Sequence, residues 1–332
     1  MIDIQQCKAS LPDVSFSEEC FPLTIYAKLE QQNLAVWINK NKNIIDNLIS
    51  QCGSLLFKGF NIDSAQRLSE VVHGYSPDVL DYVDRGAPRR AMAKKVFSST
   101  EYACTEVIPQ HHEMAFADKC PQKLFLCCDT PAQEGGFTPI TDDRKVIGLI
   151  PNDIKQPFID KGIMYVRNYG LGVDMSWQEA FDTQDKSFVE QVLTEAKTDF
   201  QWFDDDHLRT TAVRNALERH PMTGEMVWFN HAHLFHMSNI PEDVREFLVE
   251  EYGEDGLPRN VFYGDGSKIP TSVIRMINEI YENNSVRFTW EKGDMVMVDN
   301  FLATHGRTPF SGKRCVCVAM TDLFNRTPFG EL

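Results

Sequence analysis

The chain has 332 residues, and its 42% of hydrophobic residues is enough to bury a core, which excludes a mainly disordered protein. The formal net charge of −15 at pH 7 disfavours nucleic acid as a partner, because binding to phosphates depends on clustered Lys and Arg. No apolar run reaches membrane-spanning length, the N-terminus lacks the basic start of a signal peptide, and nine scattered cysteines form no CxxC pair, so we expect a cytoplasmic protein without a membrane partner.

The first third of the chain is predicted to contain two helices with a strand between them. Apolar residues at helical spacing between 44 and 49 predict the first helix, and residues 53–60 (GSLLFKGF) predict the strand. Asp63 or Ser64 can cap the second helix. The segment 78–95 mixes Pro, Gly and charged residues, which is typical of a surface loop, and we expect it to act as a lid.

Two ligand-type residues, His111 and Glu113, follow that loop. If they lie on one β-strand, residues i and i+2 share a face, so an imidazole and a carboxylate can reach one ion together. His112 would then point to the other side, where we expect it to pack in the core or to support the site from behind. Alone, such a pair is commonly a surface salt-bridge partner, so a metal site needs support from further residues.

The middle of the chain is predicted to cover the core. Residues 124–128 (LFLCC) predict a buried strand, and a tight Gly135–Gly136 turn precedes Thr138, whose hydroxyl can donate a hydrogen bond. From roughly 141 to 285, capping residues and helical stripes predict a helical insertion.

Three histidines within this insertion, His231, His233 and His236, also have metal-like spacing. If His231 and His233 lie on a strand they share a face, which leaves a zinc site, and with it a zinc hydrolase, as an alternative. No Cys or acidic fourth ligand lies nearby in the sequence. The neighbouring residues are bulky and apolar, which favours core or the wall of a substrate cavity: Trp228, Phe229, Leu234 and Phe235.

Strands return near the C-terminus. The run 295–298 (MVMV) precedes His305, and Arg314 begins a last β-rich run. Two His and one carboxylate make the facial triad of non-haem Fe(II) oxygenases, which leaves three coordination positions open. The guanidinium of Arg314 favours a carboxylate partner, either in a dicarboxylate cosubstrate or in a structural Asp or Glu. Strands at both ends with helices between them favour a mainly β fold, with a double-stranded β-helix (jelly-roll) core flanked by helices.

Five segments that together span most of the chain carry a family resemblance: His111–Met114 (HHEM), Gly135–Arg144 (GGFTPITDDR), Arg167–Gly170 (RNYG), Trp228–His236 (WFNHAHLFH) and Asp299–Arg314. They resemble the TauD/TfdA superfamily of Fe(II)- and 2-oxoglutarate-dependent dioxygenases. The resemblance is greatest to a branch found beside nonribosomal peptide pathways, whose members typically hydroxylate amino acids, free or tethered to a peptidyl carrier protein. It implies a single dioxygenase domain over residues 1–332.

Carried over by position, the resemblance implies that His111, Glu113 and His305 bind Fe(II), and that Thr138 and Arg314 hold the distal carboxylate of 2-oxoglutarate. In many relatives a small or amide residue follows the first ligand, where this chain has a second histidine. With 2-oxoglutarate and O2 in the open positions, decarboxylation to succinate and CO2 is coupled to hydroxylation of a C–H bond. The carboxylate of Glu113 disfavours halogenation, whereas desaturation and epoxidation remain alternatives.

The residues that bind an amino-acid substrate are less well defined by the sequence. The candidates for its carboxylate or amine are Asn168, Asn230 and Arg307. A basic run can bind the same groups or a tether, or can simply be solvated: Arg85, Arg89 and Arg90. Arg307 can equally stabilise the loop at Gly306. Outside the enzymes, a non-catalytic jelly-roll binding module is the alternative, because a fold does not fix a function.

Overall fold

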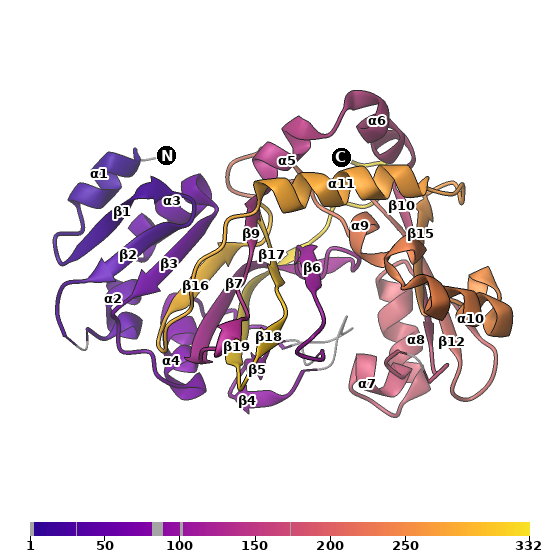
Figure 1. The fold of residues 1–332 in the computed structure, drawn as a ribbon, viewed down its shortest axis with the longest axis horizontal. Coiled ribbons are helices and arrows are strands. Elements are labelled where there is room, and N and C mark those ends of the chain that lie inside the picture. Colours follow the sequence, from indigo (N-terminus) through magenta and orange to yellow (C-terminus); the bar gives the residue numbers. More distant parts are fainter. Residues whose placement is uncertain (1–2, 31, 82–88, 100–101, 173) are drawn as a thin grey trace.

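The structure is a computed structural model that describes residues 3–30, 32–81, 89–99, 102–172 and 174–332 (Figure 1). Its largest sheet has eight strands in the order β1-β2-β3-β16-β7-β19-β5-β4. The strands are β1 (Val14–Cys20), β2 (Leu23–Ala27), β3 (Ser54–Lys58), β4 (Ala91–Ala93), β5 (Val96–Ser98), β7 (Lys119–Thr130), β16 (Met295–Asp299) and β19 (Cys315–Asn325). All neighbours are antiparallel except β2 and β3. Strands from both ends of the chain therefore meet in one sheet.

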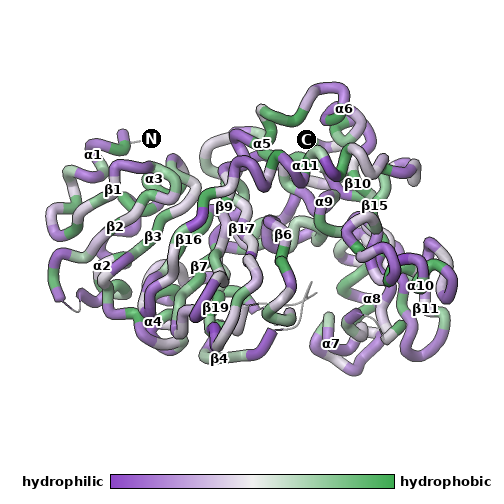
Figure 2. The backbone as a smooth tube through the Cα atoms, in the orientation of Figure 1, coloured by the Kyte–Doolittle hydropathy of each residue, from purple (hydrophilic) through white to green (hydrophobic). Residues whose placement is uncertain are grey.

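The central strands of this sheet are buried on both faces. On β16, Met295 and Met297 pack into one hydrophobic cluster, whereas Val296 and Val298 pack into another on the opposite face. The same alternation continues on the neighbouring strands β3, β7 and β19. Figure 2 shows hydrophobic segments gathered along β3, β16 and β7.

N-terminal helices belong to the first of these two clusters. They are α1 (Ile4–Ala9), α2 (Leu34–Lys40), α3 (Lys42–Cys52) and α4 (Ala65–Tyr75). The predicted helix–strand–helix start is confirmed by α3, β3 and α4. Helix α3 ends at Gly53 with φ +71°, a conformation that glycine adopts without strain. Ser64 is the cap of α4, because its side chain accepts a hydrogen bond from the backbone N–H of Arg67.

A three-stranded sheet lies against the second face of the large sheet. Its order is β6-β17-β9, with β6 at Ile108–His111, β17 at Ala303–Arg307 and β9 at Ile140–Asp142. Ala303 of β17 shares a hydrophobic cluster with Val296 and Val298 of β16, so the two sheets are in contact. A short pair, β8 (Glu134–Gly135) and β18 (Phe310–Ser311), extends this layer.

The stretch between roughly 141 and 285 contains helices, as predicted, and also strands, of which the sequence indicated only the one that begins at Met226, through a turn at Pro221–Gly224. A four-stranded antiparallel sheet has the order β11-β12-β10-β15, with β10 at Ile163–Tyr169, β11 at Asp199–Trp202, β12 at Leu208–Arg214 and β15 at Arg259–Tyr263. A hairpin pairs β13 (Leu217–Arg219) with β14 (Met226–Trp228). The α-helices are α5 (Asp143–Leu149), α6 (Asn152–Lys161), α7 (Trp177–Phe181), α8 (Lys186–Glu195), α9 (Ala232–Phe235), α10 (Glu242–Tyr252) and α11 (Thr271–Asn284). Two short 3-10 helices complete it, Met237–Asn239 and Glu254–Gly256.

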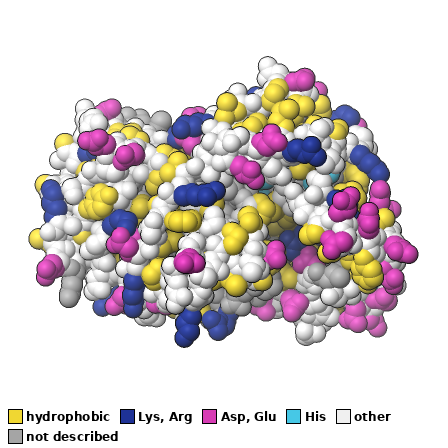
Figure 3. Space-filling model, in the orientation of Figure 1, with side chains coloured by type: hydrophobic (Ala, Val, Ile, Leu, Met, Phe, Trp, Pro, Cys, Tyr) yellow, Lys and Arg dark blue, Asp and Glu magenta, His cyan; other side chains and the backbone are white. Residues whose placement is uncertain are grey.

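The acidic surface agrees with the net negative charge, and the free cysteines agree with the absence of a CxxC pair. Asp and Glu side chains are spread over the face seen in Figure 3, with many at the end where α10 lies. All nine cysteines lie in the described part of the chain, and each is a free thiol. Across the described ranges, every helix is too short or too polar to cross a lipid bilayer.

Candidate functional site

The structure brings His111, Glu113 and His305 together at the strand pair β6–β17. His305 lies directly opposite His111 in the register of the two strands, and their ring centroids are 4.5 Å apart. Oε2 of Glu113 is 3.9 Å from Nε2 of His305. One ligand atom from each of the three residues lies within 4.8 Å of the other two. In the described part of the chain, no other group of three His, Cys, Asp or Glu side chains converges in this way.

The route by which Glu113 reaches the site differs from the prediction. Strand β6 ends at His111, so Glu113 is not on the same strand face but in the turn that follows. The next residue, Met114, has φ +58°, and this left-handed conformation turns the chain back. The side chain of Asn300 fixes the turn, because its Oδ1 accepts the N–H of Glu113 at 2.7 Å and its Nδ2 donates to the carbonyl of Glu113 at 3.0 Å. A side-chain clamp thus replaces the expected strand geometry.

Close approach of the two strands sets the distance between the imidazoles. Gly306 follows His305, and a Cβ atom there would lie 2.7 Å from the carbonyl oxygen of Ile108 on β6. Only a glycine therefore fits at this position. The Nδ1 of His111 lies 2.8 Å from the carbonyl oxygen of Pro109 and donates to it, which leaves Nε2 as the ligand-type atom.

Burial keeps both imidazoles in the form that binds a metal. Desolvation lowers the pKa of His111, and desolvation together with the neighbouring His111 lowers the pKa of His305 well below its ordinary value. Neutral imidazole is the metal-binding form of histidine. Two neutral imidazoles and one carboxylate, converging from two strands and a turn, are a donor set that fits a divalent ion such as Fe(II).

A small pocket next to the cluster contains Thr138 and Arg314, and His111 and His305 also line it. Oγ1 of Thr138 accepts hydrogen bonds from Nε1 of Trp290 at 3.0 Å and from Nη2 of Arg314 at 3.4 Å, which leaves its own O–H to donate. Burial, and then the charge of Arg307, lower the pKa of Arg314 to about 10. Among the described residues no carboxylate is paired with Arg314, so the structural Asp or Glu weighed as its alternative partner is not seen there.

The three candidates for substrate contact have structural hydrogen bonds instead. Nδ2 of Asn168 donates to the carbonyls of Asp255 and Leu257, and its Oδ1 accepts from Arg209. Asn230 bonds the carbonyl of Ala216 and the N–H of Ala232. Arg307 lines the small pocket, but its guanidinium donates to the carbonyls of three residues in one loop, Tyr102, Ala103 and Glu106. Their part in substrate binding therefore stays a prediction, and the structure shows these side chains engaged with the protein backbone.

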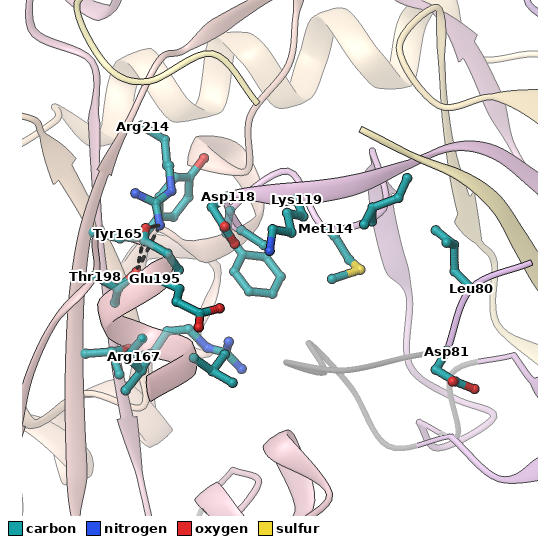
Figure 4. A pocket seen from close by; sticks show the side chains of 18 of the residues that line it. Leu80, Asp81, Met114, Asp118, Lys119, Tyr165, Arg167, Glu195, Thr198 and Arg214 are labelled. Atoms are coloured by element: carbon teal, nitrogen blue, oxygen red, sulfur yellow. Dashed lines mark hydrogen bonds between the residues drawn. The ribbon is translucent and has the colours of Figure 1, made fainter. Parts of the chain in front are cut away.

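A larger cavity of about 350 Å³ opens beside Met114, the neighbour of Glu113 (Figure 4). One wall is the face of β10 that carries Tyr165, Arg167 and Tyr169, together with α8. The other wall comes from the turn after β6, from Leu80 and Asp81 in the segment that follows α4, and from β19. Charged groups of both signs line it: Asp81, Asp118, Lys119, Arg167, Glu195 and Arg214. Its volume is in the range of small-molecule sites.

Strand periodicity explains why Arg167 of the RNYG segment faces the cavity, whereas Asn168 does not. Arg167 and Asn168 are adjacent on β10, so they point to opposite faces of the sheet. Arg167 faces the cavity, where its guanidinium lies 4.7 Å from the ring centroids of both Phe116 and Tyr169. The signal that could have selected Arg167 was the alternation of aromatic residues at 165 and 169 around it.

The second histidine group is a set of structural residues. His231 and His233 lie at the start of α9 rather than on a strand, which removes the basis for a shared face. Nε2 of His231 lies 2.6 Å from the carbonyl oxygen of His112, and Nε2 of His233 lies 2.6 Å from that of Gln110. His236 bonds Ser238 and the carbonyl of Ile269. The alternative of a zinc site at these residues has no support in their geometry.

The remaining predictions concern His112 and the loop before the site. His112 is fully buried and points away from the cluster, with ring nitrogens 2.6 and 2.8 Å from the carbonyl oxygens of Asn300 and Trp228. Arg85 and most of the expected lid, residues 82–88, lie outside the described residues. The end of that segment is not a loop, since residues 91–93 form β4. Nη2 of Arg89 donates to Oε2 of Glu113 at 2.8 Å, a contact that sequence reasoning missed.

Comparisons with known proteins agree with this geometry. The family model described as "Taurine catabolism dioxygenase TauD, TfdA family" matches residues 20–320. The dapdiamide synthesis protein DdaC of Enterobacter agglomerans is 41% identical over 278 residues, which are 84% of this chain and 84% of that protein. A clavaminate synthase-like protein of Arabidopsis thaliana is 29% identical over 293 residues, 85% of this chain and 86% of that protein.

Solved structures share the fold. PvcB of Pseudomonas aeruginosa, described as an Fe, alpha-ketoglutarate dependent oxygenase from an isonitrile synthetic pathway, has a TM-score of 0.53 at 14% identity and covers 93% of this chain and 91% of its own. AAD-2 in complex with Mn(II) and N-oxalylglycine has a TM-score of 0.54 at 11% identity, with 96% and 99% coverage. A taurine dioxygenase from Burkholderia xenovorans has a TM-score of 0.54 at 12% identity, with 97% and 93% coverage. At such identities these likenesses concern the fold alone.

Proposed function

Since this chain belongs to the TauD, TfdA family of dioxygenases, we propose that it hydroxylates an unactivated C–H bond of an amino acid or an amino-acid-derived substrate. It is an Fe(II)- and 2-oxoglutarate-dependent dioxygenase, and O2 is its second cosubstrate. In the balanced reaction, R–H, 2-oxoglutarate and O2 give R–OH, succinate and CO2. The observation that carries the proposal is the convergence of His111, Glu113 and His305 beside the pocket of Thr138 and Arg314.

In this proposal each residue of the site has one task. His111, Glu113 and His305 would hold Fe(II), which would supply open coordination positions and the oxidative chemistry of the reaction. Arg314 and the hydroxyl of Thr138 hold the distal carboxylate of 2-oxoglutarate, because a buried guanidinium and an O–H donor are the groups that a carboxylate needs. The register of β6 and β17 keeps the ligands together, as the bond of His111 to Pro109 keeps its Nε2 directed at the cluster.

The substrate is proposed to lie in the cavity beside Met114, in contact with Arg167. This cavity is lined by three acidic and three basic side chains, counted as Asp81, Asp118 and Glu195 against Lys119, Arg167 and Arg214. Such a mixed lining suits a molecule that carries both an amine and a carboxylate. The similarity to a dapdiamide synthesis protein supports a biosynthetic role, in which a peptidyl carrier protein can present the substrate.

The architecture belongs to the same proposal. We infer that the eight-stranded sheet and the β6-β17-β9 sheet are the two layers of a double-stranded β-helix, since β17 packs on the face of β16. The chain is then a single dioxygenase domain, with an insertion at roughly 141–285 that provides one wall of the cavity.

Two measurements test this function. Anaerobic addition of Fe(II) and 2-oxoglutarate should produce a visible metal-to-ligand charge-transfer band, and a non-catalytic binding module would give none. A screen of free and carrier-bound amino acids should then find one that raises succinate release and gains an oxygen atom by mass spectrometry. Glu113→Ala should abolish both signals, whereas Glu134→Ala, at an exposed carboxylate on β8, should keep them. An unsaturated or epoxide product would favour the desaturase or epoxidase alternative over hydroxylation.

A further inference from the structure

Arg89 is a third arginine at the site, beside Arg307 and Arg314. Its Nη2 donates to Oε2 of Glu113 at 2.8 Å, and both side chains are 4% exposed. The same Oε2 atom lies 3.9 Å from Nε2 of His305. Arg89 therefore contacts the same carboxylate oxygen that lies near the imidazole of His305.

Arg89 also lines the small pocket that holds Thr138 and Arg314. The guanidinium of Arg89 donates to Glu113 of the cluster, whereas that of Arg314 donates to Thr138 and to the carbonyl of Gly136. Arg89 and Arg314 therefore line one pocket but bond different groups in it. Arg89 lies where the pocket meets the cluster, and Arg314 lies next to Thr138.

The two carboxylates of the cosubstrate explain why two arginines would line this pocket. 2-Oxoglutarate carries two carboxylates, and a carboxylate taken out of water needs a counter-charge and hydrogen-bond donors. A guanidinium has five N–H donors in a planar fork, so it can donate to Glu113 with one nitrogen and to a second carboxylate with another. The far carboxylate is proposed to lie at Arg314, which leaves the carboxylate next to the keto group at the end where Arg89 lies.

We propose that Arg89 is a positioning residue that binds Glu113 and the C1 carboxylate of 2-oxoglutarate together. This rests on the proposed function of the pocket as the 2-oxoglutarate site. Arg89 then orients the carboxylate ligand and the keto-acid end of the cosubstrate relative to each other. The competing interpretation is that Arg89 only neutralises Glu113 and makes no contact with the cosubstrate.

Truncated analogues of the cosubstrate separate these interpretations. 4-Oxopentanoate keeps the ketone and the far carboxylate but lacks the C1 carboxylate, whereas pyruvate keeps the keto acid and lacks the far carboxylate. Dissociation constants are measured on the full-length Fe(II) protein without O2, from the charge-transfer band for 2-oxoglutarate and pyruvate and by competition for 4-oxopentanoate. Arg89→Met should weaken 2-oxoglutarate and pyruvate roughly 10- to 100-fold, the range for a lost hydrogen bond to a charged group, and should change 4-oxopentanoate less than about threefold. Arg314→Met should show the reverse selectivity.

Two further variants test whether a loss of affinity comes from the guanidinium fork of Arg89 or from its charge alone. Arg89→Lys keeps the charge but loses the fork, so its affinity for pyruvate should lie between that of the wild type and Arg89→Met. Lys94→Met removes an exposed positive charge nearby and should leave all three constants unchanged. The inference is overturned if Arg89→Met and Arg89→Lys weaken the three ligands equally, or weaken only Fe(II) binding measured without cosubstrate. Absence of any charge-transfer band in the wild type would instead overturn the proposed function itself.

Discussion

Buried histidines occur at two neighbouring places in this molecule, and they do different work. At the strand pair β6–β17, His111 and His305 direct ring nitrogens toward each other and toward Glu113. At the start of α9, His231 and His233 direct Nε2 to the backbone carbonyls of β6 and its turn. Both pairs are kept neutral by burial, which lowers the pKa of each ring. Residue type and burial therefore do not identify a metal ligand, whereas the atoms that the ring nitrogens face do.

The two histidine pairs also have different roles in the structure. The pair on the strands forms the site, and the pair on α9 holds the segment 110–112 in place through its carbonyl groups. A backbone carbonyl in the core needs a donor, and a neutral imidazole supplies one N–H. Substitutions at the first place should therefore remove metal binding, and those at the second place should mainly lower stability.

The largest effect is expected from His305→Ala. Loss of a ligand should weaken Fe(II) binding by more than about 100-fold, beyond what loss of a supporting residue causes, and should abolish succinate formation. Metal content after dialysis and succinate release measure this, with circular dichroism to check the fold. His207→Ala, before β12 on the outer sheet, is the matched control and should keep its metal. Retention of metal by His305→Ala would indicate that the α9 histidines bind the metal, and would contradict the roles given to the two pairs.

At acid pH, the histidines at the start of α9 should lower the free energy of unfolding. Burial lowers the pKa of His233 to about 4, so the folded protein keeps this ring neutral between pH 6.5 and 4 while the unfolded chain binds a proton. The free energy of unfolding should fall as the pH drops through this window, by up to about 3 kcal/mol from His233.

His233→Gln tests that origin, because glutamine can still donate to the carbonyl of Gln110 but does not titrate. Urea unfolding at pH 7, 5.5 and 4.5 should show a smaller acid loss in this variant than in the wild type. Equal losses in both proteins would assign the acid sensitivity to other groups.

Arg314→Met separates two functions within the site at β6–β17, since it should weaken binding of the cosubstrate and leave binding of the metal nearly unchanged. Removing a charged hydrogen-bond donor costs about 2 kcal/mol, so 2-oxoglutarate should bind roughly 30-fold more weakly, with Fe(II) affinity nearly unchanged. Calorimetry with each ligand measures both constants. Thr138→Val should cause a smaller loss, whereas Thr138→Ser keeps the hydroxyl and should restore affinity. A parallel loss of Fe(II) would argue that Arg314 supports the cluster instead.

The smallest effect is expected from His231→Gln, the residue that links the two places. Its ring bonds the carbonyl of His112, which lies between two of the proposed ligands, and its centroid is 5.9 Å from that of His111. A small shift of the turn should weaken Fe(II) only about threefold and lower the free energy of unfolding by about 1 kcal/mol. Fluorescence-monitored metal titration and urea unfolding report the two values. A loss as large as that of His305→Ala would erase the distinction between the pairs.

Much of the core could be predicted from the sequence because apolar runs identify buried strands directly. Residues 124–128 and 295–298 became β7 and β16, and Ser64 capped α4 as its position suggested. The grouping of His111, Glu113 and His305 was also found, although Glu113 reaches the site through a turn that local rules did not predict. Asn300, nearly two hundred positions away, makes that turn, and such a long-range clamp leaves no local signal.

The cavity was harder to predict because its wall comes from strands that carry charged residues. On β10 and β12, Arg167 and Arg209 interrupt the apolar pattern, and both strands were assigned to a helical insertion. A one-residue difference along β10 then decides whether a side chain faces the cavity or the opposite side. A prediction of whether Asn168 or Arg167 faces the cavity needs the sheet register, which the sequence alone does not provide.

The missing side chain of Gly306 has a chemical consequence for the whole centre. A methyl group there would press on the carbonyl of Ile108 and push the two strands apart, which would widen the bite of the chelate formed by the imidazoles. Since transition-metal ions differ in the geometry they tolerate, we expect Gly306→Ala to change the relative affinities of the proposed site for divalent ions.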